Sequence, residues 1–217
     1  MDFENRSYNP DGVFRPKPFL VQKTDLMLIT TSWSTQNEAE LTSTAILQQI
    51  EQTAREDVTT LNAPVSESET QVDHLRQSLL VTAQMIYKKT NSKHARLLLE
   101  SLVLQKIGNS LIWAHVGQPH LFLLRSGRVA TLAAQADHSL LDTNLPPLPN
   151  SGLGLESQTF VQTGSLRLLA GDQILLLAQS WLPQWPVWEK NPSFRHLTSD
   201  LIDRQPTQPF WCGIIRF

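Results

Sequence analysis

Residues 111–127 read LIWAHVGQPHLFLLRSG and are the most informative stretch of the chain. Two short apolar runs in this stretch have the length of β-strands, and Gly117-Gln118-Pro119 between them is a turn signal. Before and after this stretch, further short apolar runs are separated by glycine-containing turns. The four predicted strands cover residues 97–107, 111–116, 121–124 and 129–132. Their close spacing predicts an antiparallel meander.

The segment before the meander has the pattern of one strand and two helices. Residues 1–24 are predicted to be irregular and then extended, 26–29 to form a strand, and 30–35 a turn of small residues. Apolar residues recur at helical spacing from Asn37 to Ala54 and from Val72 to Ile86. The polar residues 62–70 between them predict a loop.

The segment after the meander has more loop signals. Residues 142–164 are rich in Pro, Gly, Asn and Ser and predict a long loop. Residues 166–169 and 174–178, on either side of Gly171-Asp172, predict a hairpin. A helix over 195–202 and a last strand over 210–217 complete the chain. The absence of repeats and of a linker in the sequence predicts a single domain over residues 1–217.

Composition narrows the class of protein. Apolar residues make up 41% of the chain, charged residues 18%, and the net charge is −2, which argues against a general nucleic-acid or anionic-membrane binder. The one cysteine, Cys212, excludes an intrachain disulfide and a cysteine-based zinc site. No apolar run reaches the ~20 residues of a membrane span, and the first residues lack the apolar region of a signal peptide. We therefore expect a cytoplasmic protein without a membrane span.

Residues 111–127 resemble the segment LYVAHVGDSRAYLLRDG of the metal-dependent serine/threonine protein phosphatases, the PPM or type 2C family. Further matches follow in the family's order: residues 6–11 (RSYNPD) for RxxNED, 40–46 (ELTSTAI) for the helix GEVASxxAV, 137–140 (DHSL), 169–177 (LAGDQILLL) for LxxGDxLLL, and 212–217 (CGIIRF) for the last strand. The resemblance implies an α+β fold, a four-layer α-β-β-α sandwich of two antiparallel sheets flanked by helices.

The resemblance also implies a site for two Mg²⁺ or Mn²⁺ ions, and most of its ligands are missing. The family holds these ions with four acidic residues, of which this chain keeps one, Asp11. The other three positions carry Thr31, Ser180 and Gln208, and an additional acidic position of the family carries Gln118. Hard dications need carboxylate ligands, and neutral Thr, Ser and Gln supply no charge. The sequence thus predicts a lost metal site, no catalytic residues and no cofactor.

Several other residues have two readings each. Arg6 matches the family's phosphate-contacting arginine and is either an anion contact or a surface arginine. Asp11 is either a residual metal ligand or a turn former in Asn-Pro-Asp-Gly. The tryptophans Trp181, Trp185 and Trp188 either form a partner-binding patch or fill a core.

Three functions remain open from the sequence. The first is a catalytically inactive PPM-type phosphatase-like protein, a pseudophosphatase, that binds another protein such as a kinase or a phosphoprotein. The second is an active phosphatase with an atypical Mg²⁺ or Mn²⁺ site, built on Asp11 with histidines among His115, His120 and His138. The third is a structural subunit of a larger assembly.

Overall fold

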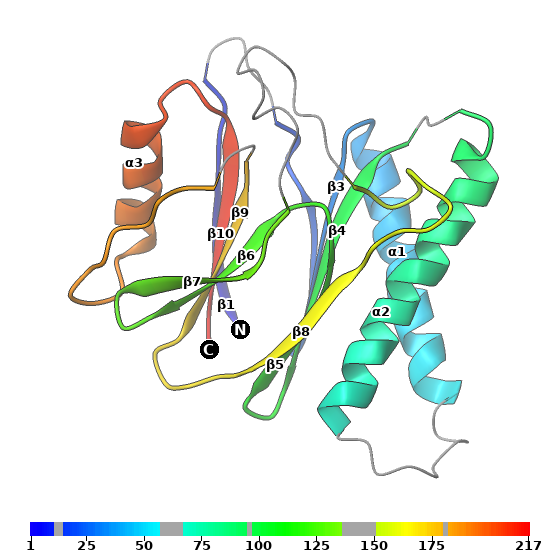
Figure 1. Ribbon diagram of the computed structural model, residues 1–217, viewed down its shortest axis with the longest axis horizontal. Coiled ribbons are helices and arrows are strands. Elements are labelled where there is room, and N and C mark those ends of the chain that lie inside the picture. The colour runs from blue at the N-terminus through cyan, green and yellow to red at the C-terminus, as the bar shows by residue number, and fades with distance from the viewer. Residues whose placement is uncertain (11–14, 57–66, 95–96, 136–150, 180–181) are drawn as a thin grey trace. The chain divides into compact units, whose positions relative to one another are not determined.

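The computed structural model describes residues 1–10, 15–56, 67–94, 97–135, 151–179 and 182–217. Its strands form two five-stranded sheets in which every pair is antiparallel (Figure 1). The chain divides into two compact units. The first unit comprises Met1–Lys17, Gln118–Asn150 and Leu169–Phe217, and the second comprises Pro18–Gly117 and Ser151–Leu168.

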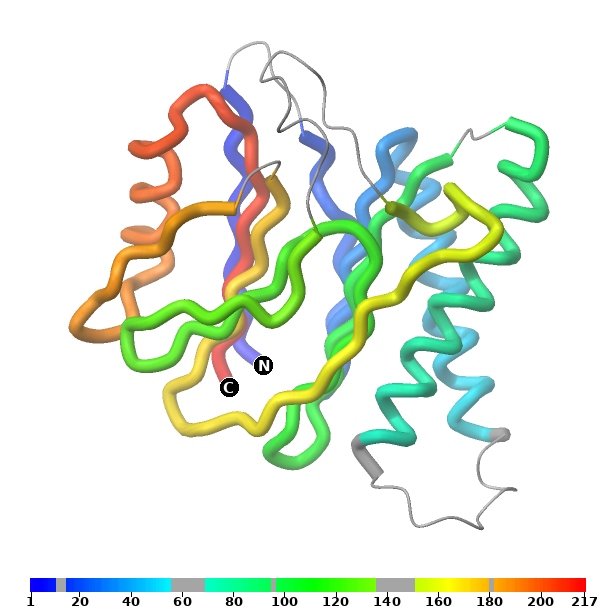
Figure 2. Tube along the Cα trace, in the orientation of Figure 1, coloured from blue at the N-terminus to red at the C-terminus, as the bar shows by residue number. Residues whose placement is uncertain are grey.

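The first unit is built on a sheet that joins the two ends of the chain. Its strands, in sheet order, are β1 (Asp2–Tyr8), β10 (Phe210–Arg216), β9 (Gln173–Ala178), β6 (His120–Arg125) and β7 (Arg128–Ala133). The tubes of β1 and β10 run side by side in Figure 2. Helix α3 (Phe194–Arg204) begins at Ser193, whose side chain accepts a hydrogen bond from the backbone N–H of His196. The helix packs Phe194, Leu197 and Leu201 into a core with Phe122, Leu175 and Ile214.

The second unit places two helices on one face of its sheet. The strands, in sheet order, are β2 (Phe19–Gln22), β3 (Leu26–Ser32), β4 (Leu99–Ile107), β5 (Ser110–Val116) and β8 (Gln162–Arg167). The helices are α1 (Gln36–Glu56) and α2 (Glu67–Ile86), and α2 continues into a π-helical turn, η2 (Tyr87–Asn91). Ile46, Leu75 and Leu79 at helical spacing are fully buried against Leu28 and Val103 of the sheet. Hydrophobic burial therefore fixes which faces of α1 and α2 meet the strands.

The predicted elements are largely confirmed, and so is the fold class of two antiparallel sheets flanked by helices. The strand over 26–29, both long helices, the helix over 195–202 and the last strand all occur. Residues 30–32, predicted as a turn, still belong to β3, and residues 67–70, predicted as a loop, are the first residues of α2. No helix in the described ranges is long and apolar enough to cross a membrane.

The predicted meander is confirmed at its first and last pairings, β4 with β5 and β6 with β7, and is wrong between β5 and β6, while the hairpin predicted around Gly171-Asp172 is wrong. The chain leaves one sheet at Gly117-Gln118-Pro119, so β5 pairs with β4 and β8, whereas β6 pairs with β7 and β9. Strands β8 and β9 likewise belong to different sheets, and β8 covers residues 162–164, which were predicted as loop. A short turn between two apolar runs fits a sheet-to-sheet crossing as well as a hairpin, and local sequence does not separate the two.

Candidate functional site

The end of strand β3 carries Thr31, one of the positions where the resemblance expects an acidic residue. The hydroxyl of the preceding residue, Thr30, accepts a hydrogen bond of 2.9 Å from Ser43 of α1. Successive side chains of a strand point to opposite faces, so Thr31 lies on the sheet face away from the helices. Its side chain is 2% exposed, and its Oγ1 atom has no hydrogen-bond partner among the described residues.

A buried carboxylate lies directly across the ladder from Thr31. Glu100 of β4 is in register with Thr31 and is 1% exposed. Its Oε2 atom accepts a hydrogen bond of 3.1 Å from the indole Nε1 of Trp33. Gly117, with φ +76°, packs on the same side chain, because a Cβ atom there would stand 2.6 Å from Cγ of Glu100. Sequence reasoning missed Glu100, although a single acidic residue within the apolar run 97–104 was a visible signal.

In the first unit, Gln118 is the centre of a buried hydrogen-bond network. Its Oε1 atom accepts a hydrogen bond of 2.6 Å from Nη1 of Arg15, and its Nε2 atom donates one of 3.0 Å to the backbone carbonyl of Gln179. His120 contacts the same carbonyl through Nε2 at 3.3 Å, and its Nδ1 atom accepts from the N–H of Gln135. Arg15 is 3% exposed and Gln118 4% exposed. Sequence reasoning singled out Gln118 and missed Arg15.

The other predicted site residues have separate surroundings. Arg6 is exposed on β1 in register with Cys212, and its Nη1 atom donates to Oγ1 of Thr198 on α3 at 3.1 Å. Gln208 is half-buried in the turn before β10, where its backbone N–H donates to Gln205 at 3.2 Å. The contact of Arg6 with a phosphate or another anion stays a prediction. Four predicted residues lie outside the described ranges, namely Asp11, His138, Ser180 and Trp181.

Comparison with known proteins gives one clear result. No protein-family model matches the chain, and no curated protein matches it in sequence. Solved structures match it over nearly its whole length. PppA, described as a key regulatory component of T6SS in Pseudomonas aeruginosa, superimposes with a TM-score of 0.64 over 100% of this chain and 98% of that chain, at 14% identity. The chain has the PPM phosphatase fold.

Two further structures agree with this assignment. The serine/threonine phosphatase PstP/Ppp of Mycobacterium tuberculosis has a TM-score of 0.62 at 12% identity, over 98% of this chain and 97% of that chain. The serine/threonine phosphatase Stp1 of Staphylococcus aureus has a TM-score of 0.65 at 10% identity, over 100% and 95%. Identities this low show the PPM phosphatase fold and do not carry over an activity.

Of the positions that the resemblance pairs with the family's acidic ligands, the three that the structure describes hold no carboxylate. Thr31, Gln118 and Gln208 are neutral, and Gln118 already uses both ends of its amide on Arg15 and Gln179. Dications with oxygen ligands need several carboxylates to compensate the loss of their hydration. Within the described ranges, no three His, Cys, Asp or Glu side chains form a group that could hold a metal. The buried histidines His115 and His120 are therefore not part of such a group among these residues.

Two of the three tryptophans predicted as a partner patch have contacts inside the first unit of the PPM phosphatase fold. Trp185 and Trp188 are partly buried against the core that α3 covers, and the ring of Trp185 stands edge-on to Phe122 with centroids 5.5 Å apart. The backbone N–H of Trp188 donates to the carbonyl of Gly127 at 2.9 Å. These contacts favour the core-filling reading of Trp185 and Trp188.

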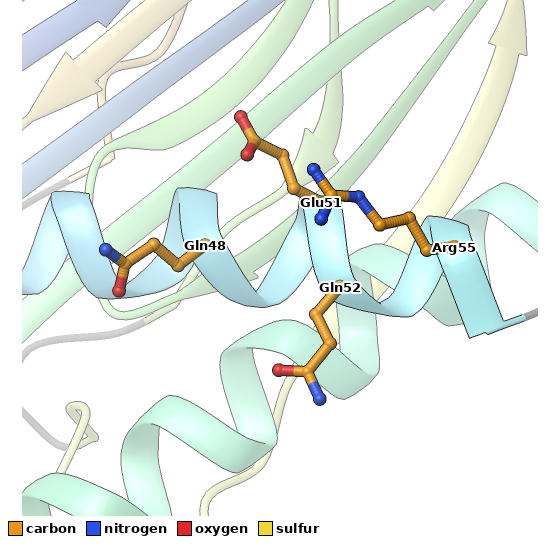
Figure 3. A pocket seen from close by; sticks show the side chains of 4 residues that line it. All are labelled: Gln48, Glu51, Gln52 and Arg55. Atoms are coloured by element: carbon orange, nitrogen blue, oxygen red, sulfur yellow. The ribbon is translucent and has the colours of Figure 1, made fainter.

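Helix α1 carries a polar pocket of about 430 Å³ on its surface, lined by Gln48, Glu51, Gln52 and Arg55 (Figure 3). Glu51 also accepts a hydrogen bond of 3.3 Å from Nζ of Lys23. One acid, one base and two amides from a single exposed helix offer little to hold a ligand. The residues at the end of β3, at the start of β4 and around Gln118 are therefore the better candidates for a function.

Proposed function

We propose that this chain is a catalytically inactive PPM-type phosphatase-like protein that acts as a protein-binding or regulatory module. The observation that carries the proposal is the pair formed by Gln118 and Arg15. Gln118 stands where the resemblance places an acidic residue, and it binds a buried guanidinium instead of supplying charge for a metal. A positive group at this position repels a dication that the family's carboxylate would attract.

The neutral donors support the same proposal. Thr31 and Gln208 replace two more acidic positions, and a hydroxyl and an amide are weak ligands for Mg²⁺ or Mn²⁺ without neighbouring carboxylates. The activity of the family needs both ions, because they activate the attacking water and stabilise charge on the phosphoryl oxygens. A chain that keeps the scaffold without these ligands retains surfaces for binding other proteins.

The partner is proposed as a class rather than as a name. A regulatory role is attributed to PppA, a protein with the same fold. By analogy with such a regulator, a kinase or a phosphoprotein in the cytoplasm is the partner class that we propose here. The fold alone does not fix that choice, so it depends on a direct binding measurement.

Metal titration tests the inactive assignment. We expect calorimetry with millimolar MnCl₂ or MgCl₂ to show no isotherm with two ions per chain, and p-nitrophenyl phosphate to remain unhydrolysed with either ion. A two-site isotherm together with turnover that Asp11→Ala abolishes would overturn the proposal. Asp25→Ala, a change of the same kind at another sequence position, is the matched control.

Glu100 favours the second candidate, an active phosphatase with an atypical metal site. Its buried carboxylate lies on β4 directly across from Thr31 of β3. The resemblance expects an acidic residue at the position of Thr31, so the acidic group is displaced by one strand. This candidate predicts Mn²⁺-dependent hydrolysis that Glu100→Gln removes while the fold, followed by circular dichroism, is kept. Hydrolysis that is absent in the unmodified chain with Mn²⁺, Mg²⁺ and Zn²⁺ would exclude this candidate.

A further inference from the structure

Positive charge is concentrated in one part of the sequence. Residues 74–99 contain no Asp or Glu and five basic residues, namely Arg76, Lys88, Lys89, Lys93 and Arg96. The segment therefore carries +5, whereas the whole chain has a formal net charge of −2. Because the chain as a whole is acidic, this concentration of positive charge indicates a local basic surface. It does not indicate a general affinity for polyanions.

The structure places part of this charge next to exposed apolar side chains. Val81 and Met85 of α2 are 38% and 51% exposed, and Lys88 and Lys89 of η2 are exposed further along the same helical rod. Met85 follows Val81 by four residues, and Lys88 and Lys89 follow Met85 by three and four, which puts the four side chains along one side of the rod. We call these four residues the α2–η2 stripe. The opposite face of α2 is buried through Leu75, Leu79 and Ala83.

The amines of this region are not neutralised within the described part of the chain. No described carboxylate lies within 4.0 Å of the Nζ atom of Lys88, Lys89 or Lys93. Interaction with the negative end of the helix dipole explains a lysine in the last turn. The dipole has no bearing on Val81 and Met85, whose exposed apolar side chains lie beside the lysines.

The end of the stripe is held in place by Asn91. This side chain is buried at the last position of η2, where Nδ2 donates to the carbonyls of Leu97 at 2.6 Å and of Gly154 at 2.8 Å. Its Oδ1 atom accepts from the N–H of Leu97 at 3.1 Å. These bonds fix the backbone from which Lys88 and Lys89 project, so this chain loses less conformational freedom when a partner binds there. π-Helical turns of this kind are frequent at functional positions.

We propose that the α2–η2 stripe binds an acidic segment of a partner protein that also presents apolar side chains. Lys88 and Lys89 pair with the carboxylates, and Val81 and Met85 receive the apolar groups, for which the flexible thioether of methionine is well suited. A protein segment is favoured over a nucleic acid or a membrane because the chain as a whole is negative and the stripe contains two lysines. The inference rests on the proposed binding role and names the chemistry of the partner.

Selection from a random peptide library displayed on phage tests the inference with the full chain as bait. We expect the recovered peptides to be enriched in Asp and Glu together with Leu or Phe. Their affinity for Lys88→Glu/Lys89→Glu should fall about tenfold or more, and it should also weaken as NaCl rises from 50 to 200 mM. Peptides without acidic enrichment, or with equal affinity for the charge-reversed variant, would overturn the inference.

Matched variants separate the local surface from total charge. Lys17→Glu/Lys190→Glu changes the net charge by the same amount at exposed residues of the first unit and should leave peptide binding within about twofold. Met85→Ser should weaken binding, whereas Leu169→Ser, at a similarly exposed residue, should not. The inference would also be overturned if the unmodified chain bound vesicles or DNA but no peptide, and the Lys88→Glu/Lys89→Glu variant lost that binding. The Mn²⁺ titration reports on the inactive assignment alone, so the two proposals fail separately.

Discussion

Nη1 of Arg15 lies 2.6 Å from Oε1 of Gln118, and both side chains are almost completely buried. The orientation of the amide follows from its neighbours. A guanidinium can only donate and the carbonyl of Gln179 can only accept, so Oε1 must face Arg15 and Nε2 must face Gln179. Gln118 is thus the one uncharged side-chain type of its length that satisfies both groups at once.

Replacing Gln118 by leucine should destabilise the chain by about 2–4 kcal/mol. Leucine has a similar volume, but it removes a hydrogen bond from a buried guanidinium and one donor from the carbonyl of Gln179, which keeps its contact of 3.3 Å with Nε2 of His120. The free energy of unfolding in urea measures the loss. Gln77→Leu on the exposed face of α2 is the control and should stay within about 0.5 kcal/mol. Equal stability of both variants would show that the Gln118 network contributes nothing.

Replacing Gly117 by alanine should be more costly than the same change at Gly108. Both glycines have positive φ, +76° and +55°, so each substitution carries a backbone cost of about 1 kcal/mol. Only at Gly117 does the added Cβ collide, at 2.6 Å from Cγ of Glu100, whereas nothing lies within 4 Å at Gly108. The collision should add about 1–3 kcal/mol.

Chemical denaturation of the two glycine variants isolates the collision, because their difference cancels the shared backbone cost. A difference near zero would mean that Glu100 moves aside freely. That outcome would contradict a tightly packed position for this carboxylate near the start of β4.

The sequence predicted the elements of the fold better than their pairing. Long periodic segments such as α1 and α2 were recovered because burial of one helix face leaves a clear pattern. Strand β1 was missed because it is polar and mostly exposed, and its partner β10 lies more than 200 residues away. No local pattern reports a pairing across that separation.

The candidate site was predicted in part for a similar reason. The family resemblance pointed to Thr31 and Gln118, which the structure places at the end of β3 and in a buried network. It could not point to Glu100 or Arg15, since neither occupies a position that the motifs name. Their role depends on burial and cross-strand register, which exist only in the folded chain.

Replacing Trp33 by phenylalanine should destabilise the chain by about 1–2 kcal/mol. The change keeps an aromatic ring and removes the N–H that donates to Oε2 of Glu100 at 3.1 Å. Trp185→Phe is a matched control, because its buried Nε1 has no hydrogen-bond partner among the described residues, so removal of that N–H should cost little. If the two variants lose equal stability, the hydrogen bond from Trp33 to Glu100 does not contribute to the stability of the fold.

The ion pair of Asp172 with Arg125 should make stability depend on pH in the acidic range. Asp172 accepts hydrogen bonds from Nε and Nη2 of Arg125 at 2.8 and 2.6 Å and from the N–H of Leu169 at 2.8 Å. The bond from Arg125 holds the pKa of the Asp172 carboxyl below its ordinary value of 3.8. A carboxyl whose pKa is lower in the folded state stabilises that state above its unfolded pKa, and this contribution is lost as pH falls through the folded pKa.

Asp172→Asn should therefore cost about 1–2 kcal/mol at pH 7, because the NH₂ of the amide cannot accept a hydrogen bond, whereas solvent at the partly exposed Arg125 weakens the electrostatic loss. The difference from the unmodified chain should shrink as the pH falls below about 4, because the Asp172 carboxyl then takes up a proton in the unfolded chain before it does so in the folded one. Urea unfolding at a series of pH values measures both the loss of stability at pH 7 and its decrease in acid. Asp203→Asn, at an exposed residue of α3, should show neither effect. A difference that stays constant down to pH 2 would mean that the hydrogen-bond geometry, and not the charge of Asp172, holds the turn before β9.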